Sequence, residues 1–416
     1  MKPPELKETR LTNGLTLVHL HTKNDPISAC HLFLPGGTDR EPIQKAGLTT
    51  LMWSLLTKGT QTRSARQIAE DIESIGAAIG AGATHDYSEI SCHAVSEYFL
   101  PALDIMGDAL FRPLFAASEV EKEKAALTAG IRSKKESIFT VANEILNQQL
   151  YGNHPYSRPS SGTENSVASL SAEDLKQWHS KTMAPQGALL AVASNHPFPQ
   201  VRKEIEKIFG AACWKKTKLV PKKSAPTPPI KSTRIVRQKE KFEQAYLLIG
   251  YGAPKISSAD YVPLKILNAL LGGGMSARLF QQLREQEGLA YDVGAFYASK
   301  KCGSAFVAYM GLQASKLEDA KKRMLHALKE VMVQPVPKQE LTETKNYIKG
   351  TFLMDHQTNS QRAHYLGWWK ILGLRSDMDK HYIKLVDQVT VKDLHRVAKK
   401  ILAGKSVTVE IIPDKK

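Results

Sequence analysis

A proline- and lysine-rich segment near the middle of the 416-residue chain is the feature that most constrains its fold. Residues 214–232 contain four prolines and show no apolar periodicity, which is typical of an extended, semi-rigid linker. About 200 residues lie on either side of it, enough in each case to bury a sizeable core. We therefore expect two domains, at residues 1–213 and 233–416, joined by a linker at 214–232.

The two parts of the chain look like copies of one plan. In both, strands come first, and a long helix, a turn marked by proline and a second helix follow. The match is clearest between residues 96–124 and 315–345. Strands grouped with long helices, without strict alternation, predict α+β layers rather than a parallel sheet. The expected fold is α+β, with two homologous domains, each a mainly antiparallel sheet packed with helices.

Individual elements follow from the apolar periodicity and from the turn residues. Strands are expected within residues 15–21, 27–37, 87–95, 189–195, 242–253 and 302–312. Helices are expected at 43–57, 64–75, 96–111, 119–131, 261–271, 276–286, 316–333 and from 338 onward, with another that begins after Ser171 as N-cap.

Composition excludes several classes of protein. Hydrophobic residues make up 42% and charged residues 24% of the chain, as in an ordinary globular protein. The net charge of +16 is compatible with nucleic acid, an anionic membrane surface or an acidic partner. The lysines are dispersed outside the linker and no nucleic-acid recognition module is present, so an acidic protein partner or acidic peptides are favoured.

Cysteine usage and apolar runs bear on location. Cys30, Cys92, Cys213 and Cys302 are widely spaced and form no C-x-x-C, so they read as thiols in a reducing compartment. No apolar run approaches the roughly 18 residues of a membrane span, and the polar N-terminus shows no secretory signal. A cytoplasmic location is expected, or a periplasmic one if a signal peptide has been removed.

Residues 36–60, GGTDREPIQKAGLTTLMWSLLTKGT, resemble the zinc-helix segment of the inverted-zincin peptidases, the pitrilysin family that includes the mitochondrial processing peptidases. In that family the helix carries H-x-x-E-H: two histidines bind zinc, and the glutamate takes a proton from the zinc-bound water. The flanking glycines and the Lys-Gly-Thr match, but the motif positions hold Thr50, Trp53 and Ser54. Neutral hydroxyls are poor zinc ligands, and an indole accepts no proton.

The family's third zinc ligand is a glutamate on a later helix, of the type V-E-K-E-R-x-x-x-x-E-E-I-R. Residues 120–124, Val-Glu-Lys-Glu-Lys, begin that pattern here, but Ala129 and Gly130 replace its two later glutamates. The resemblance therefore implies that this chain binds no catalytic zinc. By its own chemistry, segment 43–57 reads as an amphipathic core helix.

Other family segments follow in order along the chain. They are HDYSE at 85–89, YGNHPYSRP at 151–159, SAEDL at 171–175 and LLAVASN at 189–195. Each one alone is weakly specific, but the ordered set extends the resemblance from about residue 8 to residue 412.

Residues 272–291, GGGMSARLFQQLREQEGLAY, resemble the C-terminal-domain signature of the same family. In its two-chain members, the subunit that lacks zinc supplies an arginine and a tyrosine from this segment to the shared site. Those positions are Arg284 and Tyr291. A guanidinium offers forked donors to a peptide carbonyl or carboxylate, and a phenol can donate to the oxyanion that forms during hydrolysis. Without the resemblance, they would read as a surface arginine and a core tyrosine.

Gly272, Gly273 and Gly274 have two interpretations. One is a flexible substrate-binding loop, as in the non-catalytic subunit of the mitochondrial enzyme, although the longer glycine-rich insertion of that subunit is missing here. The other is a helix C-cap and a tight turn before Ser276. His19 and His21 share one face of a strand, but no third ligand is evident.

The resemblance implies a non-catalytic subunit of a heterodimeric zinc metallopeptidase. A homologous partner would carry H-x-x-E-H and the zinc, this chain would hold no cofactor, and both would act on peptides. The alternative is a purely structural subunit of the same fold, like the core subunits of the respiratory cytochrome complex, with no part in proteolysis.

Overall fold

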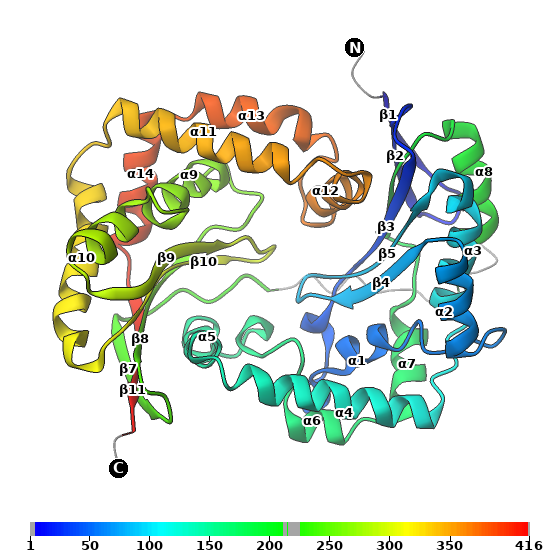
Figure 1. Cartoon of the computed structure of the whole chain (residues 1–416), viewed down its shortest axis with the longest axis horizontal. Coiled ribbons are helices and arrows are strands. Elements are labelled where there is room, and N and C mark those ends of the chain that lie inside the picture. Colours follow the sequence, from blue (N-terminus) through cyan, green and yellow to red (C-terminus); the bar gives the residue numbers. More distant parts are fainter. Residues whose placement is uncertain (1–4, 211–213, 215–224, 415–416) are drawn as a thin grey trace. The chain divides into compact units, whose positions relative to one another are not determined.

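The computed structural model describes residues 5–210, Trp214 and 225–414. The chain forms two compact units, which are described separately (Figure 1). Within the described residues, the first unit comprises 5–132, 159–210 with Trp214, and 355–379; the second comprises 133–158, 225–354 and 380–414.

The first unit is built on a six-stranded sheet in the order β1-β2-β6-β3-β5-β4. Its strands are β1 (Glu5–Arg10), β2 (Thr16–His21), β3 (Ile27–Pro35), β4 (Ala78–Ala83), β5 (Tyr87–Val95) and β6 (Leu189–Ser194). Only β2 and β6 run parallel among the neighbouring pairs, so the sheet is mainly antiparallel. β4 forms one edge of the sheet.

Helices cover both faces of this sheet. The core face packs against helices of the first two segments: α1 (Leu48–Ser54), α2 (Ala65–Ser74), α3 (Ser96–Phe111), α4 (Ala117–Lys134), α7 (Ala172–Thr182) and α8 (Phe198–Phe209). The short helix α6 (Glu164–Ala168) packs against the 3₁₀ turn at Ile43–Lys45. The opposite face is covered by α12 (Asn359–Ile371), which lies against β3 and β6. Along β3, Cys30, Leu32 and Leu34 therefore enter the main core, while His31 and Phe33 point the other way, as expected for a strand.

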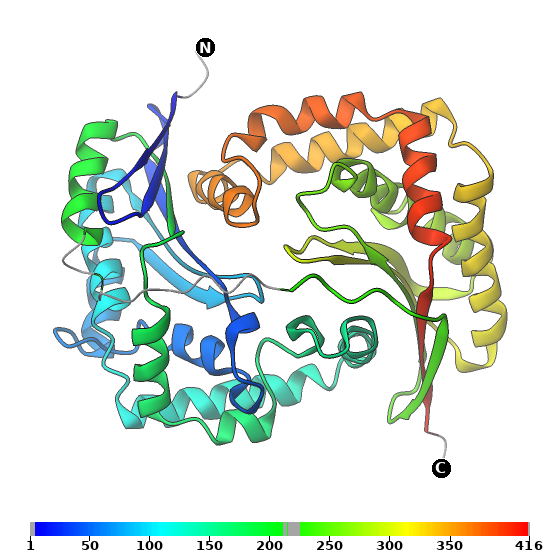
Figure 2. The ribbon, with the colours of Figure 1, turned by 180° about the vertical axis from the view of Figure 1, so that it is seen from behind.

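The second unit repeats the plan with a five-stranded sheet in the order β7-β11-β8-β10-β9. Its strands are β7 (Arg234–Glu240), β8 (Ala245–Ala253), β9 (Ala290–Ala298), β10 (Ser304–Leu312) and β11 (Ser406–Pro413). The parallel pair is β7 and β11, which lie side by side although they come from opposite ends of the second half of the chain (Figure 2). The five strands of this sheet, in the order β7-β11-β8-β10-β9, thus correspond in order and direction to the strands β2-β6-β3-β5-β4 of the first unit.

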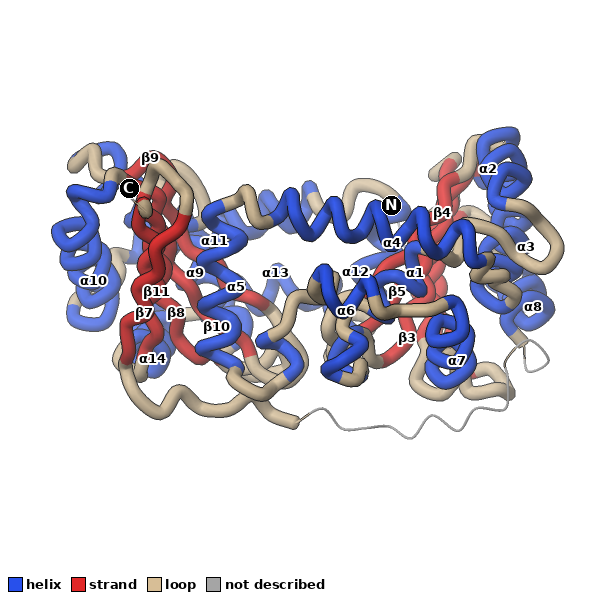
Figure 3. The backbone as a smooth tube through the Cα atoms, turned by 90° about the horizontal axis from the view of Figure 1, so that it is seen from below, coloured by secondary structure: helices blue, strands red, loops and turns tan. Residues whose placement is uncertain are grey.

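Helices again cover both faces. They are α9 (Tyr261–Gly272), α10 (Leu317–Val333), α11 (Lys338–Met354), α13 (Met378–Gln388), α14 (Val391–Leu402) and a π-helix at Phe280–Gln286. α5 (Ile138–Tyr151) packs on β8 and β11, on the side of the sheet away from α10 (Figure 3). Its Ala142, Leu146 and Leu150 complete the apolar cluster around Leu248 and Val409.

The two units exchange one helix each. α5 precedes the linker but packs on the second sheet, and α12 follows the linker but packs on the first sheet. The compact units are therefore not continuous in sequence, unlike the division into 1–213 and 233–416, which stays a prediction about the two homologous halves. Of the linker 214–232, residues 215–224 lie outside the described part, and 225–232 form neither helix nor strand.

The expected α+β architecture is confirmed, and most elements lie where the periodicity places them. The strand at 87–95 and the helix at 96–111 match residue for residue. The helix expected at 43–57 is wrong in its bounds: Gly47 has a φ of 92°, so a single 3₁₀ turn at Ile43–Lys45 is separated from α1, which begins at Leu48. The helix expected at 276–286 is mainly the π-helix at Phe280–Gln286.

Two smaller expectations concern cysteines and membranes. Cys30, Cys92 and Cys302 are free thiols, and Cys213 lies outside the described residues. Among the described residues, no helix has both the length and the apolar character needed to cross a bilayer.

Candidate functional site

The motif helix α1 is held at its N-terminus by the carboxylate of Glu41. One oxygen of Glu41 accepts from the backbone N–H of Gly47 at 2.9 Å, and the other accepts from that of Thr49. These are two of the donors that the first turn of a helix leaves without intrahelical partners. On the same turn, Thr49 Oγ1 accepts from Trp178 Nε1 at 3.0 Å. The helix is therefore fixed in place by contacts inside the first unit.

The side chains at the three positions of the family's metal motif make contacts inside the fold. Thr50 Oγ1 donates to the carbonyl of Ser160 at 2.7 Å, and Ser54 Oγ donates to the carbonyl of Leu51 at 2.9 Å. Trp53, where the family has its general base, is only 1% exposed and packs in the main core. The helix thus offers two bonded hydroxyls and a buried indole.

The third-ligand positions lie on an exposed stretch of α4. Ala129 and Gly130 are both exposed, and neither side chain carries a ligand atom. A Cβ at Gly130 would meet no heavy atom within 4 Å, so packing does not require glycine there. None of the five positions, three in α1 and two in α4, can therefore supply a zinc ligand or general base of the family's kind.

Arg284 and Tyr291 are both exposed on the second unit. The guanidinium of Arg284 lies over the ring of Phe280, 4.9 Å from its centroid, within the π-helix. Tyr291 is 51% exposed, so it is not the core tyrosine of the alternative interpretation. In the pairing of β9 with β10, Ala290 and Asp292 lie opposite consecutive residues, which leaves Tyr291 as the extra residue of a β-bulge. Bulges re-aim side chains and are common beside active sites.

The three glycines at 272–274 differ in whether close packing requires glycine at their positions. A Cβ on Gly272 would lie 1.9 Å from the backbone N of Ala295, and one on Gly273 would lie 2.6 Å from the Cα of Ala269. Close packing at the end of α9 accounts for both glycines. Gly274 is exposed, and a Cβ there would make only an ordinary contact with Tyr347. Of the three, only Gly274 is left without a packing reason, and a role in substrate binding stays a prediction.

The structure also brings together a cluster that the sequence did not indicate: His31 on β3, Glu89 on β5 and His364 on α12. Nδ1 of His31 contacts Oε1 of Glu89, and Nδ1 of His364 lies 3.1 Å from the same oxygen. Burial raises the pKa of Glu89, but hydrogen bonds from the two imidazoles outweigh burial and lower it to about 2. The carboxylate is therefore ionised at neutral pH. His364 is 275 residues from Glu89, so no local pattern signals the cluster.

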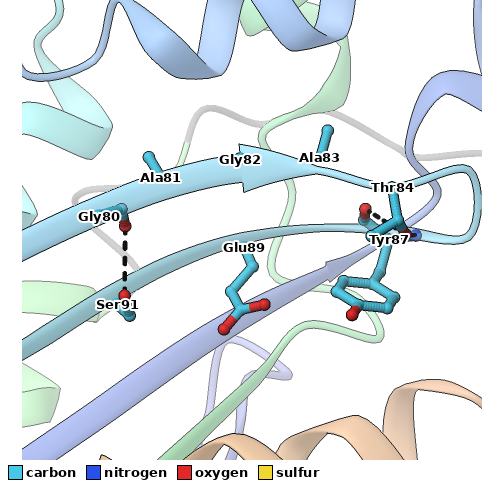
Figure 4. Close-up of a pocket in the computed structure, with 8 residues that line it drawn as sticks. All are labelled: Gly80, Ala81, Gly82, Ala83, Thr84, Tyr87, Glu89 and Ser91. Carbon is cyan, nitrogen blue, oxygen red and sulfur yellow. Dashed lines mark hydrogen bonds between the residues drawn. The ribbon is translucent and has the colours of Figure 1, made fainter. Parts of the chain in front are cut away.

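A cavity of about 350 Å³ lies along the edge strand β4 (Figure 4). Its walls are β4 with the adjoining Thr84, and Tyr87, Glu89 and Ser91 of β5. Tyr87 and Glu89 project from the same face of β5, as residues two apart on a strand do. The residues of β4 that line it are Gly80, Ala81, Gly82 and Ala83, whose small side chains leave the edge of the sheet accessible.

The paired histidines of β2 serve the fold. His19 Nε2 lies 3.0 Å from Ser194 Oγ, and His21 Nε2 lies 3.1 Å from the carbonyl of Asn195. Burial lowers the pKa of His19 to about 4, so its ring is neutral at pH 7. Both side chains link β2 to the end of the parallel neighbour β6.

Comparison with known families gives two adjacent matches. Residues 16–164 match the model described as "Insulinase (Peptidase family M16)", and residues 169–348 match the model described as "Peptidase M16 inactive domain". Together they span most of the chain.

Whole-chain relatives and solved structures agree with these matches. A Bacillus subtilis protein named "Uncharacterized zinc protease YmxG" is 27% identical over 395 residues, which is 94% of each chain. A Rickettsia felis protein named "Uncharacterized zinc protease" is 24% identical over 408 residues, covering 98% of this chain and 97% of its own length.

Two solved structures share the fold. One is described as a peptidase M16 inactive domain from Pseudomonas fluorescens, with a TM-score of 0.92, 22% identity and coverage of 99% of this chain and 98% of its own. The other is described as a protease from Helicobacter pylori, with a TM-score of 0.93, 20% identity and coverage of 99% and 100%.

Proposed function

Because the chain belongs to peptidase family M16, the pitrilysin-like peptidases, we propose that it is a non-catalytic subunit, without catalytic zinc of its own, in a two-chain zinc metallopeptidase. A homologous partner carries H-x-x-E-H and the zinc, and this chain contributes peptide-binding surface and two functional side chains. The observation that carries the proposal is Trp53, a buried indole where the family places its general base. A side chain that accepts no proton cannot activate a zinc-bound water.

The edge strand β4 supports peptide binding. An extended peptide can add to an exposed sheet edge through main-chain hydrogen bonds, with its side chains in neighbouring pockets. The cavity of about 350 Å³ beside β4 supplies such a pocket. A Cβ on Gly82 would meet nothing within 4 Å, so no contact within the fold requires glycine there. Glycine at such a position is typical of a strand that another backbone approaches closely.

The exposed pair Arg284 and Tyr291 supports a contribution to the partner's active site. The arginine side chain is exposed, with its donors available to a peptide carbonyl or carboxylate. Tyr291 lies on the bulge of β9, and in this proposal its hydroxyl donates to the oxyanion that forms when zinc-bound hydroxide attacks a peptide bond. In this proposal both side chains face the peptide rather than the subunit contact.

The net charge of +16 supports an acidic face on the partner or acidic peptides as substrates. Attraction between oppositely charged surfaces speeds association and weakens as salt screens it. Assembly of the pair should therefore slow as ionic strength rises.

The test is reconstitution with an H-x-x-E-H homologue from the same organism. Each chain and the mixture are analysed by size-exclusion chromatography and by cleavage of a peptide library. We expect a heterodimer that cleaves peptides, while this chain alone cleaves none. A partner that is fully active alone and forms no complex contradicts the proposal. A complex whose turnover is insensitive to changes at Arg284 and Tyr291 favours the alternative, a structural subunit with no role in proteolysis.

A further inference from the structure

Three elements that are distant in sequence deliver three potential metal ligands to one point in the first unit. His31 comes from β3 and Glu89 from β5, and α12 brings His364 against them. One ligand atom from each lies within 4.8 Å of the other two. In the part of the chain that the structure describes, this is the one group of three or more histidine, cysteine or acidic residues placed to hold an ion.

The face of α12 that lies on the sheet is adapted to this approach. Ser360, His364 and Gly367 are four and three residues apart, so they share one side of the helix. A Cβ on Gly367 would lie 2.1 Å from the ring of Phe33, which is two residues from His31 on β3. Only glycine allows the helix to come this close, and that close approach brings the imidazole of His364 within 3.1 Å of Glu89.

The donor set matches the preferences of zinc. Two imidazoles and one carboxylate are a common zinc ligand set, with bonds of about 2.0–2.2 Å. Ligands of a tetrahedral ion with such bonds are about 3.4 Å apart. The ligand atoms of the three residues all lie within 4.8 Å of one another, which is close to that spacing. Because Glu89 carries the only formal charge of the set when the histidines are neutral, the ligands partly balance a dication.

The surroundings also fit a metal centre. The second ring nitrogen of His31, Nε2, lies 3.3 Å from Ser360 Oγ. Metal-binding histidines usually donate their other N–H to such a partner, which fixes the tautomer and the ring orientation. His31 and Glu89 are largely buried, whereas the side chain of His364 is 32% exposed. Glu89 also lines the cavity beside β4, so an ion and a water as fourth ligand have a path to the site.

We infer that His31, Glu89 and His364 form a binding site for a divalent transition-metal ion of the zinc class, which clamps α12 onto the sheet of the first unit. The site uses other elements than the motif helix α1, so it carries none of the family's catalytic positions. The expectation that the degenerate motif binds no catalytic zinc is unaffected, because these ligands are assembled elsewhere in the first unit. The inference does not depend on the proposed function.

The competing interpretation is a metal-free clamp, in which the two imidazoles simply donate to Glu89. Both arrangements bury the same groups, but only the metal site makes the stability of the folded chain depend on zinc. A metal ion needs the lone pair of each coordinating nitrogen, so a proton on that nitrogen moves to the other ring nitrogen or is released to solvent. Metal binding then stabilises the folded chain as metal occupancy rises, whereas a hydrogen-bonded clamp gains nothing from added zinc.

The experiment uses the untagged full chain, without a partner or peptide. After chelator treatment and removal of the chelator, zinc is titrated in by calorimetry, and Co²⁺ is titrated in to give a visible ligand-field spectrum. We expect one equivalent of zinc, a cobalt spectrum typical of four-coordination, and a Tm that rises with zinc. Glu89→Gln and His364→Ala should abolish all three. Ser360→Ala should weaken zinc binding about 10- to 100-fold, since it removes only the partner of a ligand.

The matched control is His326→Asn. His326 is on the exposed face of α10, with Nε2 3.5 Å from Oε1 of Glu330, and this pair lies outside any three-ligand group in the described residues. This variant should bind zinc like the native chain. Circular dichroism checks that each variant folds, and His364→Gln replaces His364→Ala if the latter does not. Failure of the native chain to bind zinc, or equal binding by folded Glu89 and His364 variants, overturns the site and leaves the hydrogen-bonded clamp.

Discussion

The two segments that resemble the family's functional motifs lie in opposite environments. In the first unit, the motif helix α1 is closed: Trp53 is in the core, and the hydroxyls of Thr50 and Ser54 donate to backbone carbonyls. In the second unit, the segment 280–291 is open, with Arg284 and Tyr291 exposed. The difference indicates that the first segment is part of the packed fold, whereas the second leaves two polar side chains exposed to solvent, as the proposed role requires.

Restoring the glutamate of the motif should produce the largest effect. Trp53→Glu replaces a fully buried indole by a smaller, ionisable side chain, so it creates a cavity and buries a carboxyl group. We expect a loss of at least about 4 kcal/mol in the free energy of unfolding. Urea denaturation measures it.

Tyr291→Glu is the matched change in the open segment, and it should stay within about 0.5 kcal/mol of the native chain because Tyr291 is half exposed. If Trp53→Glu were as stable as the native protein, α1 would still tolerate the family's base, and the contrast between the two segments would be lost.

The next effect concerns turnover in the reconstituted pair. Tyr291→Phe removes one hydroxyl donor and little volume. If that hydroxyl stabilises the oxyanion, kcat should fall about a hundredfold, or ~3 kcal/mol. Thr50→Val in the closed segment is the control and should leave kcat unchanged. Near-normal turnover of the tyrosine variant, with the complex intact on gel filtration, would make Tyr291 an ordinary surface residue.

A smaller change is expected for Arg284→Ala. Anchoring by the guanidinium is present in both the ground state and the transition state, so its loss should raise KM about tenfold, or ~1.4 kcal/mol. Arg284→Lys keeps the positive charge but lacks the planar, forked donors of the guanidinium, so its KM should lie between those of the native chain and Arg284→Ala. Steady-state kinetics over a range of peptide concentrations measures this. An effect on assembly rather than on KM would place Arg284 in the subunit contact.

The two exchanged helices, α12 on the first sheet and α5 on the second, also differ in how they pack against the sheet. On the first sheet, the close approach comes from Gly367 on the helix, against the rigid ring of Phe33 on the strand. On the second sheet, the glycine is on the strand: a Cβ on Gly250 would lie 2.9 Å from a terminal methyl of Leu146 on α5. The first interface is partly polar, whereas the second is an apolar cluster.

The difference between the two helix–sheet interfaces predicts the smallest effects, on the free energy of unfolding. Gly367→Ala should destabilise by about 1 kcal/mol net, since overpacking against a ring exceeds the gain in helix propensity. Gly250→Ala should be close to neutral, because the end of a leucine side chain can move. Thermal unfolding of the two variants gives the comparison, and equal effects at the two glycines would show that both interfaces adapt equally well.

Particular residues show how much of the secondary structure the local sequence pattern predicts. Alternation over 87–95 and the apolar spacing over 96–111 placed β5 and α3 correctly, since their periods reflect burial on one face. The same reasoning made the helix at 43–57 too long, because the left-handed conformation of Gly47 depends on packing against residues near Ser161. It also missed the bulge at Tyr291, which arises only when β9 pairs with β10.

The sequence by itself determined the α+β class, the repeat of one plan, and the loss of every zinc-binding side chain from the family's motif, because each depends on residue type and local spacing. Tertiary structure alone decided that α5 and α12 are exchanged between the units, and that His31, Glu89 and His364 meet at one point. The physical reason is that these contacts join segments that are distant in the sequence, by 275 residues in the case of His364 and Glu89. No local periodicity encodes such a meeting, and only the packing of a helix onto a distant sheet brings it about.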